Sequence, residues 1–132
     1  MNTYVKDVMS HKIFSIDCNE TVRKACEIYR DSRVGCLIVT DNENIVGLVT
    51  ERDIIVRTIC MGRDPNTTKL EEITTKNIKT IDKNERIEKA IAMIKENKIK
   101  KLPVTFNNEL VGMITITDIA YSRPSMKDLF QF

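Results

Sequence analysis

The chain has 132 residues, of which 42% are hydrophobic, 30% charged and 5% aromatic, with only 4 Gly and 3 Pro. The apolar content excludes a disordered chain, and the scarcity of Gly and Pro excludes collagen-like and low-complexity classes. A formal net charge of +2 and the absence of Trp do not favour charge-driven binding to nucleic acid, so no nucleic-acid partner is expected.

The first sixteen residues contain no apolar core segment, because Lys6, Asp7, His11 and Lys12 interrupt them. This pattern argues against a signal peptide. No apolar run approaches the roughly 18 to 20 residues that a membrane helix needs. The sequence therefore predicts a cytoplasmic protein without a membrane partner.

The sequence gives little indication of a metal site or of catalytic residues. The single histidine, His11, and the lack of any CxxC spacing leave a zinc cage without ligands, so no metal site is expected. No phosphate-binding GxxxxGK[ST] loop, GxGxxG or HExxH motif occurs, and no nucleophile–base pair can be assembled, which predicts a protein that is not an enzyme. The thiols are expected to be inert in a reducing compartment, with a disulfide or redox role as the alternative; they are Cys18, Cys26, Cys36 and Cys60.

An internal duplication organises the whole chain. Shifting the sequence by 65 residues aligns residues 8–56 with 73–121 without a gap, and about sixteen of the 49 pairs are identical. Chance would match only a few of them. Two copies of one structural unit are therefore expected.

Each copy predicts the same elements in chain order. A short strand is followed by a polar stop with a capping residue, an amphipathic helix, a hairpin of two β-rich runs and a final helix. The strands are predicted at 13–16, 36–40 and 45–50 in the first copy and at 78–81, 102–106 and 110–115 in the second, with caps at 17–19 or 82–84 and final helices from Glu51 or Ile116. The buried helix face is predicted at Val22, Ala25, Cys26, Ile28 and Tyr29, and at Ile87, Ala90, Ile91, Met93 and Ile94.

These elements predict an α+β fold of two β-α-β-β-α repeats. The hairpin strands are apolar at nearly every position, which indicates burial on both faces. We therefore expect two small mixed sheets packed face to face about a pseudo-twofold axis, with the helices outside. The predicted organisation is repeat 1 at 5–62, repeat 2 at 69–121 and a tail at 122–132, whose apolar residues would dock on the domain, support dimerisation or bind a partner.

The most informative pattern is Gly-x-x-Thr-x-x-Asp, which occurs at 47–53 and again at 112–118. It spans the end of a strand and the start of a helix, where unpaired backbone N–H groups favour anions. The hydroxyls of Thr50 and Thr115 would bind a phosphate or sugar oxygen, and the carboxylates of Asp53 and Asp118 would bind a ribose diol. The alternative is a capping box without a ligand, although such boxes favour Glu or Gln at the fourth position.

Both copies resemble the CBS domain, and the pair resembles a tandem CBS module, also called a Bateman module. The resemblance rests on Ile45–Ile54 in the first copy and on Lys101–Val104 and Leu110–Ile119 in the second, and it extends from Val5 to about Tyr121. It implies a regulatory module that binds adenosyl compounds (AMP, ADP, ATP or S-adenosylmethionine) in clefts between the repeats, without catalysis and with no required cofactor. It also implies a homodimer read by an effector protein that the sequence does not identify. The alternative function is a dimerisation or interaction scaffold that needs no ligand.

The resemblance further implies basic residues near bound phosphate and apolar residues around the base. The phosphate candidates are Lys98, Lys100, Lys101 and Arg33. The base-pocket candidates are Ile13, Val34, Ile78, Ile99 and Pro103. The alternative is a solvated lysine run and ordinary core packing. Because the lysines are concentrated in the second copy, we expect two inequivalent clefts, with the lysine-lined one preferring a phosphorylated ligand.

Overall fold

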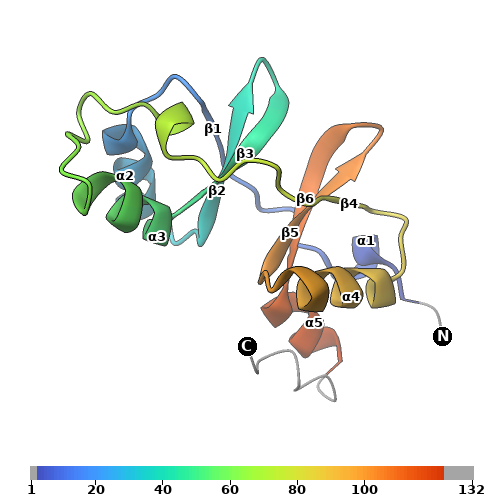
Figure 1. Ribbon diagram of the computed structural model, residues 1–132. Coiled ribbons are helices and arrows are strands. Elements are labelled where there is room, and N and C mark those ends of the chain that lie inside the picture. Colours follow the sequence, from blue (N-terminus) through green and yellow to red (C-terminus); the bar gives the residue numbers. More distant parts are fainter. Residues whose placement is uncertain (1–2, 124–132) are drawn as a thin grey trace. The chain divides into compact units, whose positions relative to one another are not determined.

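The computed structural model describes residues 3–123, and the predicted β-α-β-β-α order occurs twice within them (Figure 1). The first copy comprises β1 (Ser15–Asp17), α2 (Val22–Asp31), β2 (Cys36–Asp41), β3 (Asn44–Thr50) and α3 (Glu51–Ile54). The second comprises β4 (Ile81–Asp82), α4 (Ile87–Asn97), β5 (Lys101–Phe106), β6 (Glu109–Thr115) and α5 (Ile116–Ser122). Three short helical segments complete the described chain: α1 (Val5–Val8), the π-helix η1 (Ile55–Ile59) and the 3-10 helix η2 (Leu70–Glu72).

The two sheets have the same mixed topology. In the order β1-β2-β3, β1 is parallel to β2 and β2 is antiparallel to β3, and the sheet β4-β5-β6 repeats this arrangement. Both hairpins also carry a register shift at matching places, between Val39 and Thr40 and between Val104 and Thr105. The α+β class and the two small mixed sheets are therefore confirmed.

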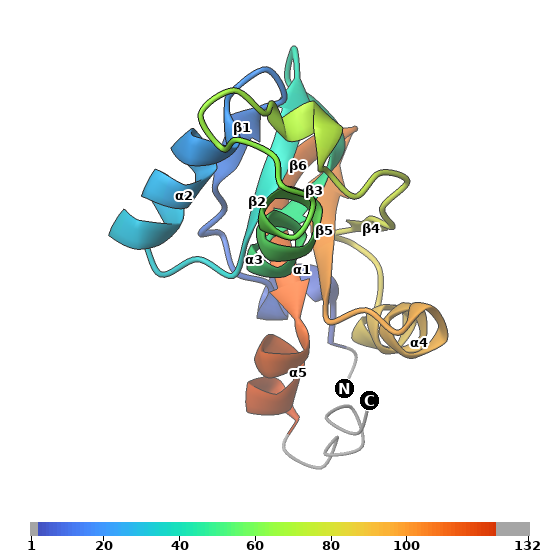
Figure 2. The same cartoon turned by 60° about the vertical axis from the view of Figure 1, so that its left-hand side comes forward.

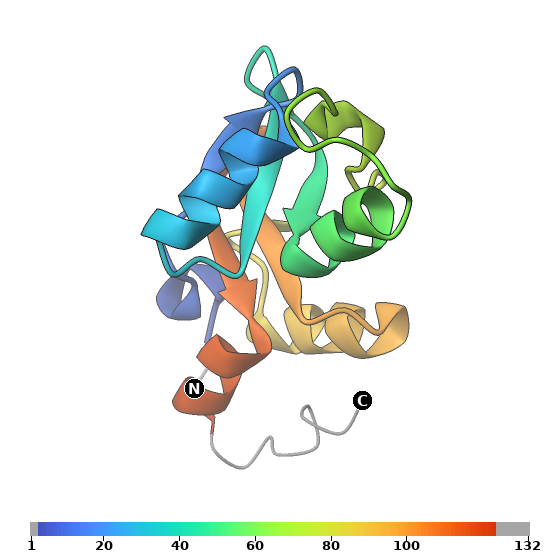
Figure 3. The same cartoon turned by 90° about the vertical axis from the view of Figure 1, so that its left-hand side faces the viewer.

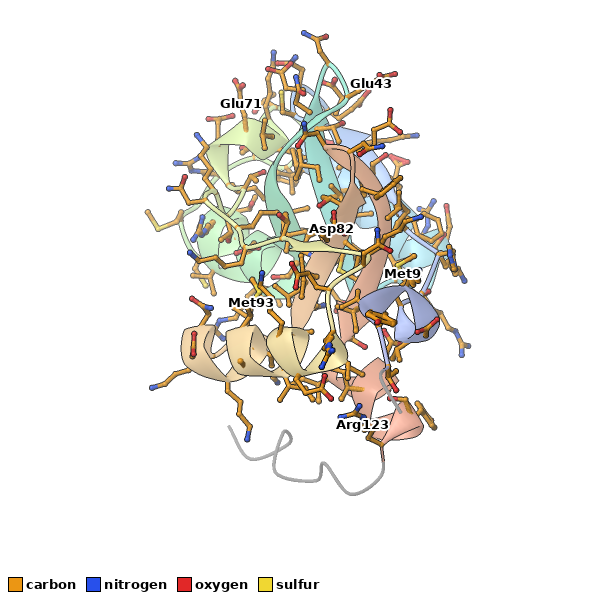
Figure 4. The ribbon with its side chains drawn as sticks, turned by 90° about the vertical axis from the view of Figure 1, so that its right-hand side faces the viewer. Met9, Glu43, Glu71, Asp82, Met93 and Arg123 are labelled. Atoms are coloured by element: carbon orange, nitrogen blue, oxygen red, sulfur yellow. The ribbon has the colours of Figure 1, made fainter. Side chains whose placement is uncertain are left out.

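Two-residue turns close both hairpins. Asn42 and Glu43 have φ angles of 49° and 71°, and Asn107 and Asn108 have φ angles of 51° and 65°. Two consecutive left-handed residues match the right-handed twist of the flanking strands, and Asn accepts this conformation more readily than most residues. Figure 4 shows Glu43 at the tip of the first hairpin.

The predicted capping residues before the central helices are wrong. The side chain of Asp17 accepts a hydrogen bond from the Asn19 N–H at 2.8 Å, so it forms a turn ahead of the helix. The cap of α2 is Thr21, whose hydroxyl accepts from the Lys24 N–H at 3.2 Å. The second copy has Arg86 at the same place without a side-chain cap. The first strands also start later than predicted, at Ser15 and Ile81.

The central helices bury the predicted face. Val22 and Ala25 of α2 are fully buried, as are Ile87, Ala90 and Ile94 of α4. In the first copy α2 and α3 cover the same face of the β1-β2-β3 sheet (Figure 3). The helical spacing of apolar residues was therefore sufficient to identify these faces.

The chain divides into two compact units whose limits differ from the repeat limits. The repeat-1 unit contains residues 14–78, and the repeat-2 unit combines residues up to Ile13 with residues from Lys79 onward. The segment ahead of each copy therefore packs on the other copy. We call residues 3–10 and 69–75 the crossing segments.

Each crossing segment contributes to the core of the unit that it joins. Val5 is fully buried in the core of the repeat-2 unit, and its N–H donates to the Glu85 carbonyl at 2.9 Å. Leu70 and Ile73 are fully buried in the core of the repeat-1 unit. Ser10 pairs with Met113 of β6, and Thr75 pairs with Leu48 of β3, through backbone hydrogen bonds of 2.8–3.1 Å.

Glycine permits this close backbone approach in both copies. A Cβ placed on Gly47 would overlap the Thr75 carbonyl oxygen and the Thr74 side chain. A Cβ on Gly112 would lie 2.8 Å from the Ser10 carbonyl oxygen and 2.9 Å from the Met9 sulfur. The glycine of the repeated motif is therefore required by the crossing segment.

Along residues 3–123, none of the helices has the length and apolar character needed to cross a bilayer. The last described residue, Arg123, is labelled in Figure 4. Its guanidinium forms an ion pair with the Glu88 carboxylate at 2.9 Å. A hydrogen bond from the Glu88 backbone N–H, together with the contact to Arg123, holds the pKa of Glu88 below its usual value. Most of the predicted tail, residues 124–132, lies outside the described residues.

Candidate functional site

The repeated Thr and Asp residues lie where the last strand of each sheet runs directly into a helix. The strand β3 runs into α3 (Figure 3), and β6 runs into α5 (Figure 2). Thr50 ends β3 and caps α3, and Thr115 ends β6 and caps α5. The antiparallel partner strand starts beside each turn, because Cys36 of β2 faces Thr50 and Lys101 of β5 faces Thr115.

In the repeat-2 unit, Thr115 and Asp118 form a reciprocal capping box. The Thr115 N–H donates to Asp118 Oδ2 at 2.9 Å, and the Asp118 N–H donates to the Thr115 hydroxyl oxygen at 3.1 Å. The other carboxylate oxygen, Oδ1, has no hydrogen-bond or ion-pair partner among residues 3–123. The half-buried carboxylate is thus held by one oxygen and presents the other.

In the repeat-1 unit, Thr50 and Asp53 form the same box with more contacts. Asp53 Oδ2 accepts from the Thr50 N–H at 2.9 Å and from the Thr50 hydroxyl at 3.1 Å, and the Asp53 N–H donates back to that hydroxyl oxygen at 3.2 Å. Asp53 Oδ1 accepts from the Thr75 hydroxyl at 3.2 Å and lies 3.7 Å from Nε of Arg57. Both pairs therefore form the capping bonds, and Asp makes them despite its shorter side chain.

Tyr29 fixes the strand end ahead of the first turn. Its hydroxyl donates to the Val49 carbonyl at 2.7 Å, which ties α2 to the last residue before Thr50. Burial raises the pKa of Tyr29 strongly, with smaller contributions from Cys36 and Glu51. The phenol consequently stays protonated and remains a donor across the physiological pH range.

The basic candidates take different places. Lys101 is half-buried opposite Thr115, and the carbonyl of the exposed Lys100 accepts from the Ile116 N–H at 3.0 Å, so the start of β5 adjoins the Asp118 turn. Lys98 is an exposed residue with φ of 51° that ends α4. Arg33 is exposed between α2 and β2.

The apolar candidates belong partly to the two cores. Val34 packs against the core of the repeat-1 unit and Ile99 against that of the repeat-2 unit, while Pro103 is buried within β5. Ile13 and Ile78 are half-buried and lie outside both core clusters, at the chain positions where the units begin and end.

The cysteines occur as free thiols, and Cys18 is buried whereas Cys60 is exposed. Burial raises the pKa of Cys18, and the carboxylates of Asp41 and Asp17 raise it further. Burial also raises the pKa of Cys26. A raised thiol pKa disfavours the reactive thiolate. Within residues 3–123 no group of three His, Cys, Asp or Glu side chains is placed to hold a metal ion.

The sequence did not identify Arg57 and Thr75 as neighbours of the candidate site. An Asp53–Arg57 pair at the i,i+4 spacing could have been recognised on the final helix. Thr75 had no comparable signal, since its position depends on the crossing segment.

These observations define a class of protein: a duplicated α+β module in which each unit carries a capped Thr-x-x-Asp turn between a strand and a helix. Comparison with known families identifies the family to which this module belongs. A model of the CBS domain matches residues 5–58 and again residues 70–124. The chain belongs to the CBS domain family and contains two copies of that domain.

Relatives of similar length support this assignment. The chain is 30% identical over 123 residues to Hypoxic response protein 1 of Mycobacterium tuberculosis, covering 92% of this chain and 86% of that protein. A crystal structure of Hypoxic Response Protein I with two coordinated zinc ions has a TM-score of 0.81 at 29% identity, covering 91% of this chain and 98% of the other. The CBS domain pair of protein MJ0100, in complex with 5′-methylthioadenosine and S-adenosyl-L-methionine, has a TM-score of 0.82 at 25% identity, covering 96% and 100%.

Proposed function

We propose that the chain is a regulatory module that binds adenosyl compounds (AMP, ADP, ATP or S-adenosylmethionine) and catalyses no reaction. Asp118 and Asp53 bind the ribose hydroxyls, and Thr115 and Thr50 hold these carboxylates in place or contact a ribose or phosphate oxygen. The module acts in the cytoplasm and requires no cofactor.

The observation that carries the proposal is the geometry of Asp118. Its Oδ2 is fixed by the Thr115 N–H at 2.9 Å, and Oδ1 has no partner among residues 3–123. A carboxylate accepts about four hydrogen bonds, and the two vicinal hydroxyls of a ribose supply two donors. A carboxylate already oriented by a cap loses little conformational freedom on binding such a ligand, which favours affinity.

The neighbouring residues support a phosphorylated adenosyl ligand. Lys101 lies opposite Thr115 in the β5–β6 ladder, and Lys100 precedes it. We assign the phosphate contact of AMP, ADP or ATP to these two lysines, with Lys98 and Arg33 as outer contacts. The candidates for the adenine pocket are the apolar side chains of Ile13, Val34, Ile78, Ile99 and Pro103.

Regulation follows if the ligand has different affinities for two conformations of the pair, since only such a difference shifts their populations. An effector protein then reads the favoured conformation, and the module acts as a homodimer. The MJ0100 domain pair, which has the same fold and is complexed with two adenosyl compounds, supports the choice of ligand class.

One observation favours the second candidate function, a ligand-independent interaction scaffold. Apolar side chains of η1 and the residues after it are exposed: Ile55 at 52%, Ile59 at 66% and Met61 at 67%. Such a group of exposed apolar residues is typical of a protein contact.

Calorimetry tests the first function. AMP, ADP, ATP and S-adenosylmethionine are titrated into the wild-type protein and into Asp118→Asn, which keeps the side-chain size and removes the charge. We expect an affinity loss of about tenfold or more, because a hydrogen bond to a charged group contributes about 1.5–3 kcal/mol. The matched control is Asp82→Asn in the same unit, whose carboxylate accepts from the Asn84 N–H at 2.8 Å in a turn before α4.

Affinity in Asp118→Asn equal to that of the wild type would contradict the ribose role of Asp118.

A thermal-shift series with the same ligands distinguishes the ligand-binding module from the scaffold, since ligand at about 100 times its Kd should raise stability by about 2.7 kcal/mol. No shift with any adenosyl ligand, together with a stable dimer in sedimentation, would favour the scaffold instead.

A further inference from the structure

Asp53 differs from Asp118 in how many of its acceptor positions are already used. A carboxylate has about four lone-pair sites. Asp53 accepts three hydrogen bonds, from the Thr50 N–H, the Thr50 hydroxyl and the Thr75 hydroxyl. Arg57 adds an ion pair to the same oxygen that Thr75 contacts. Asp118 accepts one hydrogen bond from residues 3–123, and its Oδ1 accepts none.

The two partners of Asp53 Oδ1 are held in place by the backbone. Nη1 of Arg57 donates to the carbonyl oxygens of Ile73 and Thr74 at 3.3 and 3.4 Å. Thr75 exchanges two backbone hydrogen bonds with Leu48, at 2.9 and 3.1 Å. Arg57 therefore links α3 and η1 to the crossing segment, and the Asp53 side chain beneath it is only 14% exposed.

The repeat-2 unit has different residues at both equivalent positions. The 65-residue offset places Ser122 at the position of Arg57 and Ser10 at that of Thr75. The Ser122 hydroxyl donates to the Ile119 carbonyl at 2.9 Å, and the Ser10 hydroxyl oxygen accepts from the Lys12 N–H at 3.2 Å. Within residues 3–123, neither serine hydroxyl forms a hydrogen bond with Asp118. The backbone pairing of Ser10 with Met113 nevertheless matches that of Thr75 with Leu48.

We propose that Arg57 and Thr75 act as an internal competitor for Asp53, so that ribose-containing ligands bind at Asp118 first and at Asp53 with lower affinity. This inference rests on the proposed function and adds an order of filling to it. A diol that approaches Asp53 Oδ1 must displace the Thr75 hydroxyl and separate the Arg57 ion pair. At Asp118 the same oxygen is available without either step.

The alternative role for Arg57 is to bind a ligand phosphate directly, which would raise the ligand affinity instead of lowering it. The contacts favour the competitor role, since Nε faces Asp53 and Nη1 is shared by two backbone carbonyls. The Arg57 side chain is 47% exposed, but its Nε and Nη1 are both directed at groups of the protein.

Calorimetry with AMP in an Asp118→Asn background tests the inference, because only the Asp53 turn then retains its carboxylate. We expect Arg57→Ser with Thr75→Val to raise the AMP affinity by about tenfold, as removing hydrogen-bond donors to a charged group frees the acceptor. Thr75→Val alone, which keeps the side-chain shape and Arg57, should raise it by a smaller factor. The matched control is Arg63→Ser, since Arg63 pairs with Glu72 at 3.6 Å and does not contact Asp53.

The reciprocal exchange is Ser122→Arg with Ser10→Thr in an otherwise wild-type protein, which should lower the affinity of the first AMP bound. Circular dichroism and thermal melting confirm that each variant is folded. Unchanged affinity in both exchanges, with AMP still bound by the wild type, would overturn the competitor role alone. A loss of affinity in the Arg57→Ser, Thr75→Val variant would overturn it in favour of a phosphate contact. If AMP and S-adenosylmethionine bind to no variant and not to the wild type, the proposed function fails and the inference with it.

Discussion

The two strand-to-helix turns have the same backbone and the same capping bonds, but their carboxylates have different surroundings. The capping bond from the Thr N–H to the Asp Oδ2 is 2.9 Å in both units. Only Asp53 also contacts an arginine and a threonine from outside its turn. The duplicated motif therefore determines the orientation of the carboxylate, whereas the residues at the non-identical positions determine whether its second oxygen is available.

The largest effect on stability is expected from truncating the buried side chains that the crossing segments contribute to the two cores. Leu70→Ala should lower the free energy of unfolding by about 2–5 kcal/mol, since Leu70 is fully buried in the repeat-1 core. Val5→Ala should cost less, because it removes fewer buried carbon atoms from the repeat-2 core. Amide hydrogen exchange should rise in β2 and β3 for the first variant and in β5 and β6 for the second.

Ile55→Ala serves as the control, as Ile55 is 52% exposed and its loss should change stability by less than about 0.5 kcal/mol. Faster exchange of β5 and β6 than of β2 and β3 in Leu70→Ala would contradict the crossed assignment.

The next effect is expected from the two motif glycines. Gly47→Ala and Gly112→Ala should each destabilise the protein by about 1–3 kcal/mol, since the added methyl overlaps the crossing segment. Gly47→Ala should cost more, because its Cβ overlaps both the Thr75 carbonyl oxygen and the Thr74 side chain. Denaturant titration measures the loss of stability in each variant. Equal losses would contradict the expectation that the crossing segment approaches Gly47 more closely than Gly112.

The smallest effect is expected at Tyr29, whose counterpart in the second copy, Ile94, has no polar group. Tyr29→Phe removes the donor to the Val49 carbonyl and should cost about 0.5–1.5 kcal/mol at pH 7. Because the folded-state pKa of Tyr29 is raised, its contribution is complete below the unfolded pKa of about 10 and falls as the pH rises above that value.

Urea titrations of wild type and Tyr29→Phe at neutral and alkaline pH measure this difference. The stability gap between the two proteins should narrow above a pH of about 10. A gap that stays constant would show that Tyr29 is not protonated preferentially in the folded state.

The sequence was sufficient for features that depend on local spacing. The hairpins and the buried faces of α2 and α4 follow from short-range patterns, and they were found where predicted. The duplication follows from comparing the sequence with itself, and the two matching sheets agree with it. The Thr-x-x-Asp turn is local as well, so its capping geometry could be weighed in advance as one of two alternatives.

Features that depend on distant contacts were missed. Thr75 reaches Asp53 only because residues 69–75 pack on the preceding repeat, and no periodicity indicates which copy a linking segment joins. The cap at Thr21 was missed for a different reason. Asp17 and Asn19 are residue types as suitable for capping as Thr21, but the Asp17 side chain forms a separate turn before the helix.

The crossing segments also impose an order on biosynthesis. Residues 14–78 form one unit from a continuous stretch, so its core is complete once that stretch has left the ribosome. Val5 is made earlier, but its partners Glu85 and Ile87 are made about 80 residues later. At roughly 5–20 residues per second this leaves the first crossing segment without its core for several seconds. The first crossing segment is therefore buried only after residues that are synthesised later than it.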